Sequence, residues 1–327
     1  MEIPHVRVPR SEGESVRKDL AAADVIDRNF RITECDGWLY IPIDTESPFS
    51  HDFDIVSRAG EPRDRQHMPK ELVDFPASYE RLGDIVLIDE EDSNRAQELA
   101  KAVMDSSLPV KTVLNRKSKI AGEYRVREWE LLAGTETETI HREFGAEFLV
   151  DVTKTYFSPR LATERHRVTA QVEPGEHVVD MFAGVGPFAI PMALRGATVV
   201  AIDLNPAAIC YLKENARRND VAEQITAREG DVRKIATEYA NWADRLVMNL
   251  PHRANEFLDV ARELAGTACR LHYYDIQSDN DPFAPGEAAI QEAFERAYAV
   301  NVVQRQIVRS YAPHEVNVCL DVDVVRH

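Results

Sequence analysis

The stretch Asp180-Met-Phe-Ala-Gly-Val-Gly-Pro-Phe188 stands between two valines that predict a buried strand and the apolar residues 189–194, which predict a helix. A strand, a tight glycine turn and a helix start form a corner that binds nucleotides in doubly wound α/β folds. Gly184 and Gly186 permit the sharp turn and let the backbone approach a ligand closely. The stretch therefore predicts a nucleotide-binding corner in the second half of the chain.

The details of this corner favour a positively charged nucleotide over a dinucleotide. Ala189 replaces the third glycine of the dinucleotide pattern G-x-G-x-x-G. Asp180 ends the strand just before the turn, where its charge would repel a pyrophosphate. S-adenosylmethionine has a positive centre and an amino-acid tail, so we expect it to bind here. Its predicted contacts in the corner are Asp180, Phe182, Gly184 and Gly186; an ordinary dinucleotide fold is the alternative.

Three later strand ends carry side chains that suit the same cofactor. The strand predicted over residues 198–203 ends in Asp203, whose carboxylate can accept both ribose hydroxyls. Asp231 follows a third strand and is expected to hold the adenine amino group. A fourth strand stops at Asn249 and the stiff Pro251, which would present an amide and a backbone carbonyl to a flat base.

The order of predicted elements gives the fold class and the domains. Strands and helices alternate in the last part of the chain, which predicts a doubly wound, mostly parallel sheet of the class I Rossmann-like type. Residues 299–303 and 316–325 predict two strands without a long helix between them, hence a terminal antiparallel strand. The predicted parts are an α+β domain at 1–60, a linker at 61–71, a middle α+β domain at 72–165 and the S-adenosylmethionine-binding domain at 166–327.

Shorter patterns give local expectations in the first two domains. Ser11 is a plausible cap for a helix over residues 11–23. An amphipathic pattern predicts a helix over 93–104, and two apolar runs at 148–152 and 154–157 predict strands.

Composition bounds the class of protein. The chain has 327 residues, 44% of them hydrophobic, and no apolar run long enough for a membrane span. The N-terminus has no signal-like pattern, and the four cysteines lie far apart, so we expect a cytoplasmic protein with reduced thiols. The ten histidines show no H-x-x-x-H spacing, and we expect no metal site. We also expect a monomer without an obligate protein partner.

Charge is high and unevenly distributed. The net charge is −17, and only 9 of the 39 basic residues are lysine, which is typical of proteins from a salt-rich cytoplasm; an ordinary acidic cytosolic enzyme is the alternative. Residues 110–127 nevertheless carry six basic side chains against one Glu. A basic patch in an acidic chain indicates a nucleic-acid substrate, although a solvated face is the simpler interpretation. The patch includes Arg116, Lys117, Lys119 and Arg125.

At this point the sequence resembles the archaeal and eukaryotic tRNA (guanine-N1)-methyltransferases that modify position 37, beside the anticodon. The resemblance covers nearly the whole chain. The stretches that carry it are 122–134, 156–165, 180–188, 201–206, 248–251, 272–274 and 310–313. It implies S-adenosylmethionine as cofactor and tRNA as partner, with the N-terminal domain touching the outer corner of the tRNA and the rest acting at the anticodon loop.

The family's catalytic positions correspond to Arg125, Glu164 and Asn249, with Pro251 shaping the loop. Guanine N1 carries a proton and is a poor nucleophile, so a carboxylate base such as Glu164 is required. Loss of that proton places negative charge on O6, which the guanidinium of Arg125 would stabilise. Asn249 would hold the base edge. Further RNA contacts are expected from Tyr156 by stacking, and from Arg160 and Arg165, which either bind phosphate or hold Glu164.

Other interpretations remain open. Within the fold, the nearest rival transfers the aminocarboxypropyl arm of the cofactor to a tRNA purine during synthesis of the tricyclic wyosine-type base. Methylation of a carbon in such an intermediate is a related alternative. A protein that binds RNA and keeps the cofactor only as a ligand is the non-enzyme alternative, and it would be expected to lose Glu164 or Asn249.

Overall fold

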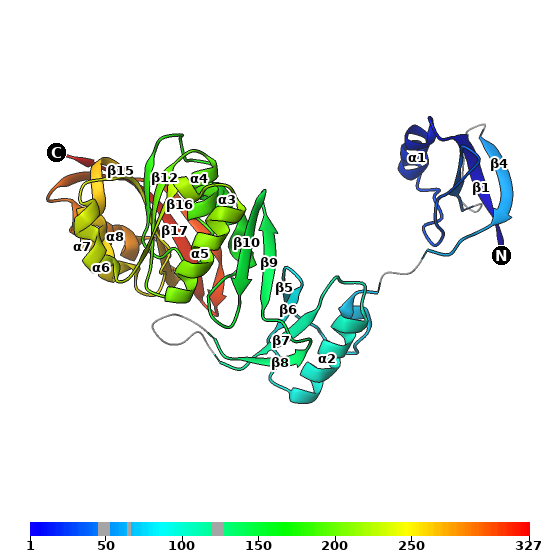
Figure 1. The fold of residues 1–327 in the computed structure, drawn as a ribbon, viewed down its shortest axis with the longest axis horizontal. Helices are drawn as coiled ribbons and strands as arrows, with labels where there is room; N and C mark the ends of the chain where they lie inside the picture. The colour runs from blue at the N-terminus through cyan, green and yellow to red at the C-terminus, as the bar shows by residue number, and fades with distance from the viewer. Residues whose placement is uncertain (45–52, 64–66, 119–126) are drawn as a thin grey trace. The chain divides into compact units, whose positions relative to one another are not determined.

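A computed structural model describes residues 1–44, 53–63, 67–118 and 127–327. The chain divides into two compact units, Met1–Met68 and Pro69–His327 (Figure 1). The boundary falls inside the linker predicted at 61–71. The further division predicted at residue 165 lies within the second unit and stays a prediction.

The N-terminal unit is a four-stranded antiparallel sheet, in the order β2-β3-β1-β4, with one helix. Strand side chains alternate between two faces. Val6 and Val8 of β1 pack on the helix through Val16 and Leu20, whereas Arg7 lies on the opposite face. The elements are β1 (Glu2–Pro9), α1 (Gly13–Ala22), β2 (Thr33–Cys35), β3 (Trp38–Pro42) and β4 (Asp54–Ala59).

The second unit begins with a smaller sheet of order β5-β6-β7-β8, covered by α2. Asp92 caps α2, because its side chain accepts hydrogen bonds from the backbone N–H groups of Asn94 and Arg95. A separate hairpin, β9–β10, follows. The elements are a 3₁₀ turn at Pro69–Glu71, β5 (Tyr79–Leu82), β6 (Ile85–Ile88), α2 (Ser93–Asp105), β7 (Thr112–Arg116), β8 (Trp129–Ala133), β9 (Glu138–Glu143) and β10 (Ala146–Asp151).

A seven-stranded sheet of order β13-β12-β11-β14-β15-β17-β16 forms the rest of the unit. Its first five strands are parallel, and β17 is antiparallel to both of its neighbours, as the sequence predicted. The strands are β11 (His177–Asp180), β12 (Thr198–Asp203), β13 (Ile225–Glu229), β14 (Ala243–Met248), β15 (Ala265–Ser278), β16 (Tyr298–Ala312) and β17 (Glu315–Arg326).

Helices cover both faces of this sheet (Figure 1). Val178 packs on the side of α3, α4 and α5, and its neighbour Val179 packs on the side of α6, α7 and α8, so the alternation of the strands divides the core into two layers. The helices are α3 (Ala162–Thr169), α4 (Ala189–Leu194), α5 (Pro206–Arg218), α6 (Val232–Ile235), α7 (Leu258–Leu264) and α8 (Ala284–Phe294). Short 3₁₀ turns occupy Pro159–Leu161, Ala222–Gln224, Ala236–Tyr239 and Ala254–Phe257.

Two local predictions were wrong. Residues 154–157 form no strand, because the chain turns after Asp151, whose side chain and carbonyl accept hydrogen bonds from Thr153 and Thr155. Ser11 is not the helix cap; the helix begins after Glu12, whose side chain makes no capping hydrogen bond. Within the described residues, no helix is both long enough and apolar enough to cross a membrane.

Candidate active site

The glycine corner lies where β11 ends, between the ends of β12 and β14. The backbone N–H of Met181 donates to the carbonyl of Val247, and that of Ala183 donates to the carbonyl of Ile202. Gly184 and Gly186 have φ values of +53° and +94°, the left-handed region that side chains disfavour. A Cβ added at Gly184 would meet only the carbonyl of Tyr156, at 3.9 Å, among the described atoms. The two backbone hydrogen bonds therefore fix the position of the corner, and the described atoms leave open space next to Gly184.

Asp180 is a buried carboxylate at the base of this corner, with 1% of its surface exposed. Oδ1 accepts a long hydrogen bond, 3.4 Å, from the backbone N–H of Phe182, whereas Oδ2 has no partner within the described structure. Burial raises the pKa of Asp180 to about 7, and the nearby charge of Asp203 adds to the rise. A buried, unpartnered carboxylate oxygen is a ready partner for a positively charged or donor group.

Asp203 lies at the end of β12 beside the same corner. Its two oxygens accept backbone hydrogen bonds of 2.7 Å from Gly184 and 2.8 Å from Asn205. Burial raises the pKa of Asp203 above its usual value despite these bonds. Each carboxylate oxygen can accept a second donor, so the pair of ribose hydroxyls predicted for this residue has acceptors available.

Asp231 and Asn249 occupy the ends of the next strands. Asp231 caps α6, accepting from the backbone N–H of Arg233, and its carboxylate also binds the Arg233 guanidinium. One oxygen of Asp231 is therefore already occupied by the N-terminal cap of α6. Asn249 is half-buried in a tight turn after β14, in which the N–H of Leu250 donates to the carbonyl of Met248. Pro251 lies in the following turn.

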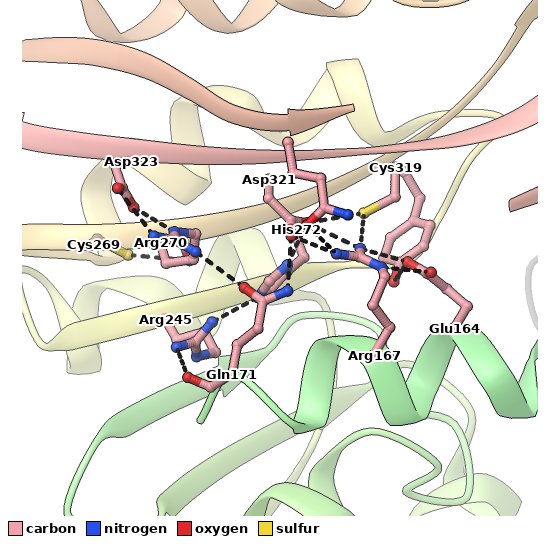
Figure 2. Close-up of polar contacts among 12 residues, drawn as sticks. Glu164, Arg167, Gln171, Arg245, Cys269, Arg270, His272, Cys319, Asp321 and Asp323 are labelled. Atoms are coloured by element: carbon pink, nitrogen blue, oxygen red, sulfur yellow. Dashed lines mark hydrogen bonds and ion pairs between the residues drawn. The ribbon is translucent and has the colours of Figure 1, made fainter. Parts of the chain in front are cut away.

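Glu164, the predicted base, lies near the start of α3 and is 7% exposed. Its two oxygens accept two hydrogen bonds of 2.8 Å from Arg167, one turn later on the helix (Figure 2). The hydroxyl of Tyr274 on β15 donates to Oε1 at 2.9 Å. The ring of Tyr274 lies 5.9 Å from that of Phe188, the last residue of the glycine corner, so Tyr274 links Glu164 to that corner.

Arg167 is shared between two carboxylates. It also donates to both oxygens of Asp321 on β17, at 2.6 and 3.1 Å, and to Gln304 at 3.2 Å. Two charge-assisted pairs fix the plane of the guanidinium. His272, Cys319 and Asp321 bring potential metal-binding atoms within 4.8 Å of one another, but the Arg167 cation contacts Cys319 and Asp321 directly. That position suits a guanidinium better than a second cation.

The network continues through His272 on β15. Its Nδ1 lies 2.8 Å from Asp321 Oδ1, and its Nε2 lies 2.8 Å from Arg245 Nη1. Arginine only donates, so Nε2 must accept and Nδ1 carries the proton that is donated to Asp321. Burial lowers the pKa of His272 below its usual value, which agrees with this neutral form. Arg245 in turn binds both oxygens of Glu176, at 2.7 and 2.9 Å.

The residues predicted to contact RNA differ in their exposure and in their ion-pair partners. Arg160 is largely exposed, with Nε 3.1 Å from Glu80, and Lys117 binds Glu130 at 2.6 Å near the surface. Arg116 pairs with Asp89, and Tyr156 is half-buried. Lys119 and the predicted catalytic residue Arg125 lie outside the described residues.

The prediction for Arg165 requires correction. Its side chain is 3% exposed and binds both oxygens of Glu143 at 2.6 and 2.7 Å, so a phosphate contact would require that buried pair to open. Arg165 does not hold Glu164 either. That role belongs to Arg167, since residues i and i+3 lie on one side of a helix and residues i and i+1 do not.

The sequence did not predict the side chains that hold Glu164, which are Arg167, Tyr274 and, through Arg167, Asp321. The i, i+3 spacing from Glu164 was the available signal for Arg167. No local pattern points to Asp321, which lies 154 residues further along the chain than Arg167. Tyr274 and His272 belonged to a stretch that carried the family resemblance, but that resemblance assigned them no role.

Three family models match successive parts of the chain. Residues 6–49 match the tRNA methyltransferase 5 N-terminal domain, residues 65–137 the TYW2 N-terminal domain, and residues 139–302 the TRM5/TYW2 methyltransferase domain. Among curated relatives, tRNA (guanine(37)-N(1))-methyltransferase Trm5b of Pyrococcus abyssi is 39% identical, over 97% of each chain. The tRNA(Phe) (4-demethylwyosine(37)-C(7)) aminocarboxypropyltransferase of Pyrococcus horikoshii is 35% identical, over 80% of this chain and 94% of its own.

Solved structures agree. A complex of aTrm5 with tRNALeu matches with a TM-score of 0.74 and 31% identity, over 98% of this chain and 99% of that one. TYW2 of Methanocaldococcus jannaschii in complex with AdoMet matches with a TM-score of 0.62 and 27% identity, over 76% of this chain and 100% of that one. The chain with the glycine corner and the Glu164–Arg167 pair therefore belongs to the TRM5/TYW2 family of methyltransferases.

Proposed function

We propose that this enzyme transfers the methyl group of S-adenosylmethionine to N1 of guanosine 37 in tRNA. The observation that carries the proposal is Glu164: a carboxylate fixed by Arg167 and Tyr274, and linked through Tyr274 to the glycine corner. Relatives that match nearly the whole chain are named for this reaction. An enzyme that methylates an N–H group requires a base at such a place.

The residues of the corner fit the cofactor. Asp180 offers the oxygen that has no partner among the described residues to a cationic or donor group, and Asp203 offers acceptors to the ribose. The space that the described atoms leave next to Gly184 admits a ligand. Phe182, Gly186, Asp231 and Asn249 complete the proposed set. When bound, S-adenosylmethionine supplies an electrophilic methyl group on a positively charged sulfur.

The chain's own residues would prepare guanine N1. Glu164 accepts the N1 proton, and Arg125 is proposed to stabilise the charge that then develops on O6. Asn249 and Pro251, in the tight turn after β14, are proposed to hold the edge of the base. Tyr156 and Arg160, with the basic residues around Arg116, are proposed to bind the anticodon stem and loop.

A second RNA surface is proposed on the N-terminal unit. On the face of its sheet opposite α1, Arg7 lies over the Trp38 ring at 4.9 Å and Arg58 over the Tyr40 ring at 4.2 Å. Trp38 is one of the exposed large hydrophobic residues. Interleaved arginine and aromatic side chains suit the phosphates and bases of RNA. We propose that this face meets the outer corner of the tRNA, and that the enzyme acts in the cytoplasm as a monomer.

The second candidate is aminocarboxypropyl transfer, because the family model covers both TRM5 and TYW2 and one relative has that name. The match of residues 6–49 to the tRNA methyltransferase 5 N-terminal domain favours the methyltransferase. Both reactions start from the same cofactor, so the mass and position of the product decide between them.

The test uses unmodified tRNA transcripts and cofactor labelled in the methyl group. We expect a mass gain of one methyl at guanosine 37 and, for Glu164→Gln, a fall of roughly 10²–10⁴ in the single-turnover rate. Label-free product with an added aminocarboxypropyl group, formed on a second substrate tRNA that already carries 4-demethylwyosine at position 37, would establish the second candidate. A Glu164→Gln rate equal to wild type would refute Glu164 as the base.

A further inference from the structure

We propose that Arg167 and Asp321 form a positioning unit that orients Glu164 and leaves it able to take the N1 proton. This inference rests on the proposed function and assigns a role to two residues outside the proposed cofactor-binding and base-binding sets. A carboxylate that is already paired with an arginine is expected to be a poor base.

The hydrogen-bond geometry shows how Glu164 can be paired with Arg167 and still have an oxygen available for the substrate proton. Glu164 Oε1 accepts two donors, Arg167 Nη2 and the Tyr274 hydroxyl, but Oε2 accepts only Arg167 Nε among the described contacts. A carboxylate has about four acceptor positions, two on each oxygen. Oε2 therefore keeps one position for the N–H of the substrate, while the other three bonds hold the carboxylate in one plane.

The charges around Glu164 show why this carboxylate can take up a proton although it is paired with Arg167. The network joins three carboxylates to two guanidinium groups, with His272 neutral, so it carries one net negative charge. Burial raises the pKa of Tyr274 and of the Cys319 thiol, so both stay uncharged beside Glu164, and Gln171 and Gln304 are neutral. Uptake of one proton makes the whole cluster neutral. The carboxylates are Glu164, Asp321 and Glu176, and the cations are Arg167 and Arg245.

Asp321 determines which carboxylate takes the proton. It accepts hydrogen bonds from Arg167, His272 and Gln171. Burial opposes ionisation, but these bonds outweigh it and hold the pKa of Asp321 far below its usual value. Asp321 therefore stays ionised and keeps Arg167 in place when Glu164 becomes neutral.

The resulting step balances in atoms and electrons. The N1–H bond breaks and its proton bonds to Glu164 Oε2, while the N1 electron pair takes the methyl group, whose bond to sulfur breaks with its electrons left on sulfur. The proton can leave Glu164 to water after the product departs. Arg167 acts only through Glu164, so it is a positioning residue.

The test compares two substitutions that should have opposite effects on the acidic limb of the single-turnover pH profile, measured with saturating tRNA and cofactor. Asp321→Asn removes the second carboxylate that shares Arg167, so the guanidinium pairs with Glu164 alone and favours the ionised base. The limb should therefore move to lower pH by about one unit or more. Arg167→Gln leaves Glu164 beside the charge of Asp321 without a cation, so the limb should move to higher pH by a similar amount.

Controls separate this effect from loss of structure. Asp323→Asn removes a carboxylate two residues along the same strand that pairs with Arg270, which reaches Asp321 through Gln171 and not directly, so the limb should move much less than in Asp321→Asn (Figure 2). Arg167→Lys keeps the positive charge but loses the bidentate contact with Glu164. Compared with Arg167→Gln, it should return the limb to its wild-type position without recovering the full rate. This variant and Asp321→Asn carry the test if Arg167→Gln fails to fold.

A measurement without turnover tests the effect of Arg167 and Asp321 on Glu164 separately from the proposed reaction. With carbon-13 in the glutamate carboxyl groups, the Glu164 signal is identified by its loss in Glu164→Gln, and its titration is followed in each variant. Opposite displacements in Asp321→Asn and Arg167→Gln would support the positioning unit. Displacements in the same direction, or none in either variant, would overturn it. A product other than 1-methylguanosine at position 37 would instead overturn the proposed function.

Discussion

Replacing Asp180 with asparagine should make the ligand-free protein more stable above neutral pH. The usual pKa of an aspartate is 3.8, and burial raises that of Asp180 to about 7. In the unfolded chain the group ionises near pH 4, whereas in the folded protein it stays protonated until about pH 7. The folded state therefore binds one more proton between these values, and stability falls as the pH rises through this window.

The magnitude follows from the same two values. A difference of about three pH units corresponds to roughly 4 kcal/mol, reached above pH 7, where Asp180 is charged in both states. Because an asparagine side chain does not ionise, Asp180→Asn lacks this cost. The variant should match the wild type near pH 4 and exceed it by up to about 4 kcal/mol at pH 8.

Urea unfolding at half-unit steps from pH 4 to 8 measures this difference. Other carboxylates titrate in the same range and cancel when the variant is subtracted from the wild type, except Asp203, whose charge is coupled to that of Asp180. Asp259→Asn, at a position that is 81% exposed, is the control for loss of a surface carboxylate, and its difference curve should vary much less than that of Asp180→Asn. If the Asp180→Asn difference varies as little as that of the control, then Asp180 is ionised at little cost in the folded protein, and it is not the unpaired carboxylate described above.

Three further predictions address binding. Asp203→Ala should weaken S-adenosylmethionine binding by about 1–3 kcal/mol in calorimetry, because charged hydrogen bonds are lost; unchanged affinity would contradict the ribose assignment. Gly184→Ala should cost only about 1–2 kcal/mol in stability, since a Cβ there meets no described atom closer than 3.9 Å, but should abolish cofactor binding by filling the space next to Gly184; retained binding would place the cofactor elsewhere. Arg58→Ala should weaken binding of full-length tRNA and reduce its salt dependence by about one, while methyl transfer to an isolated anticodon stem-loop stays unchanged; equal effects on both RNAs would refute an outer-corner role.

Much of the fold was predictable because its signals are local or periodic. The glycines at 184 and 186, the carboxylates that end β11 and β12, and the alternation of strands and helices are all recognisable within short windows of sequence. In a parallel sheet the carboxyl ends of neighbouring strands lie at one edge, so these local signals also placed Asp180 and Asp203 together.

The surroundings of Glu164 were not predictable in this way. His272 lies directly opposite Asp321 in the antiparallel pairing of β15 with β17, and this register brings them together across 49 residues of sequence. Helix α3 then places Arg167 against Asp321 from a distance of 154 residues. The sequence by itself determined which residues could carry the chemistry, and the i, i+3 spacing within α3 already favours Arg167 over Arg165 as the partner of Glu164. The pairing register and the docking of α3 decided that Asp321 holds Arg167 from the other side. Such contacts depend on packing between distant segments, which short-range patterns do not encode.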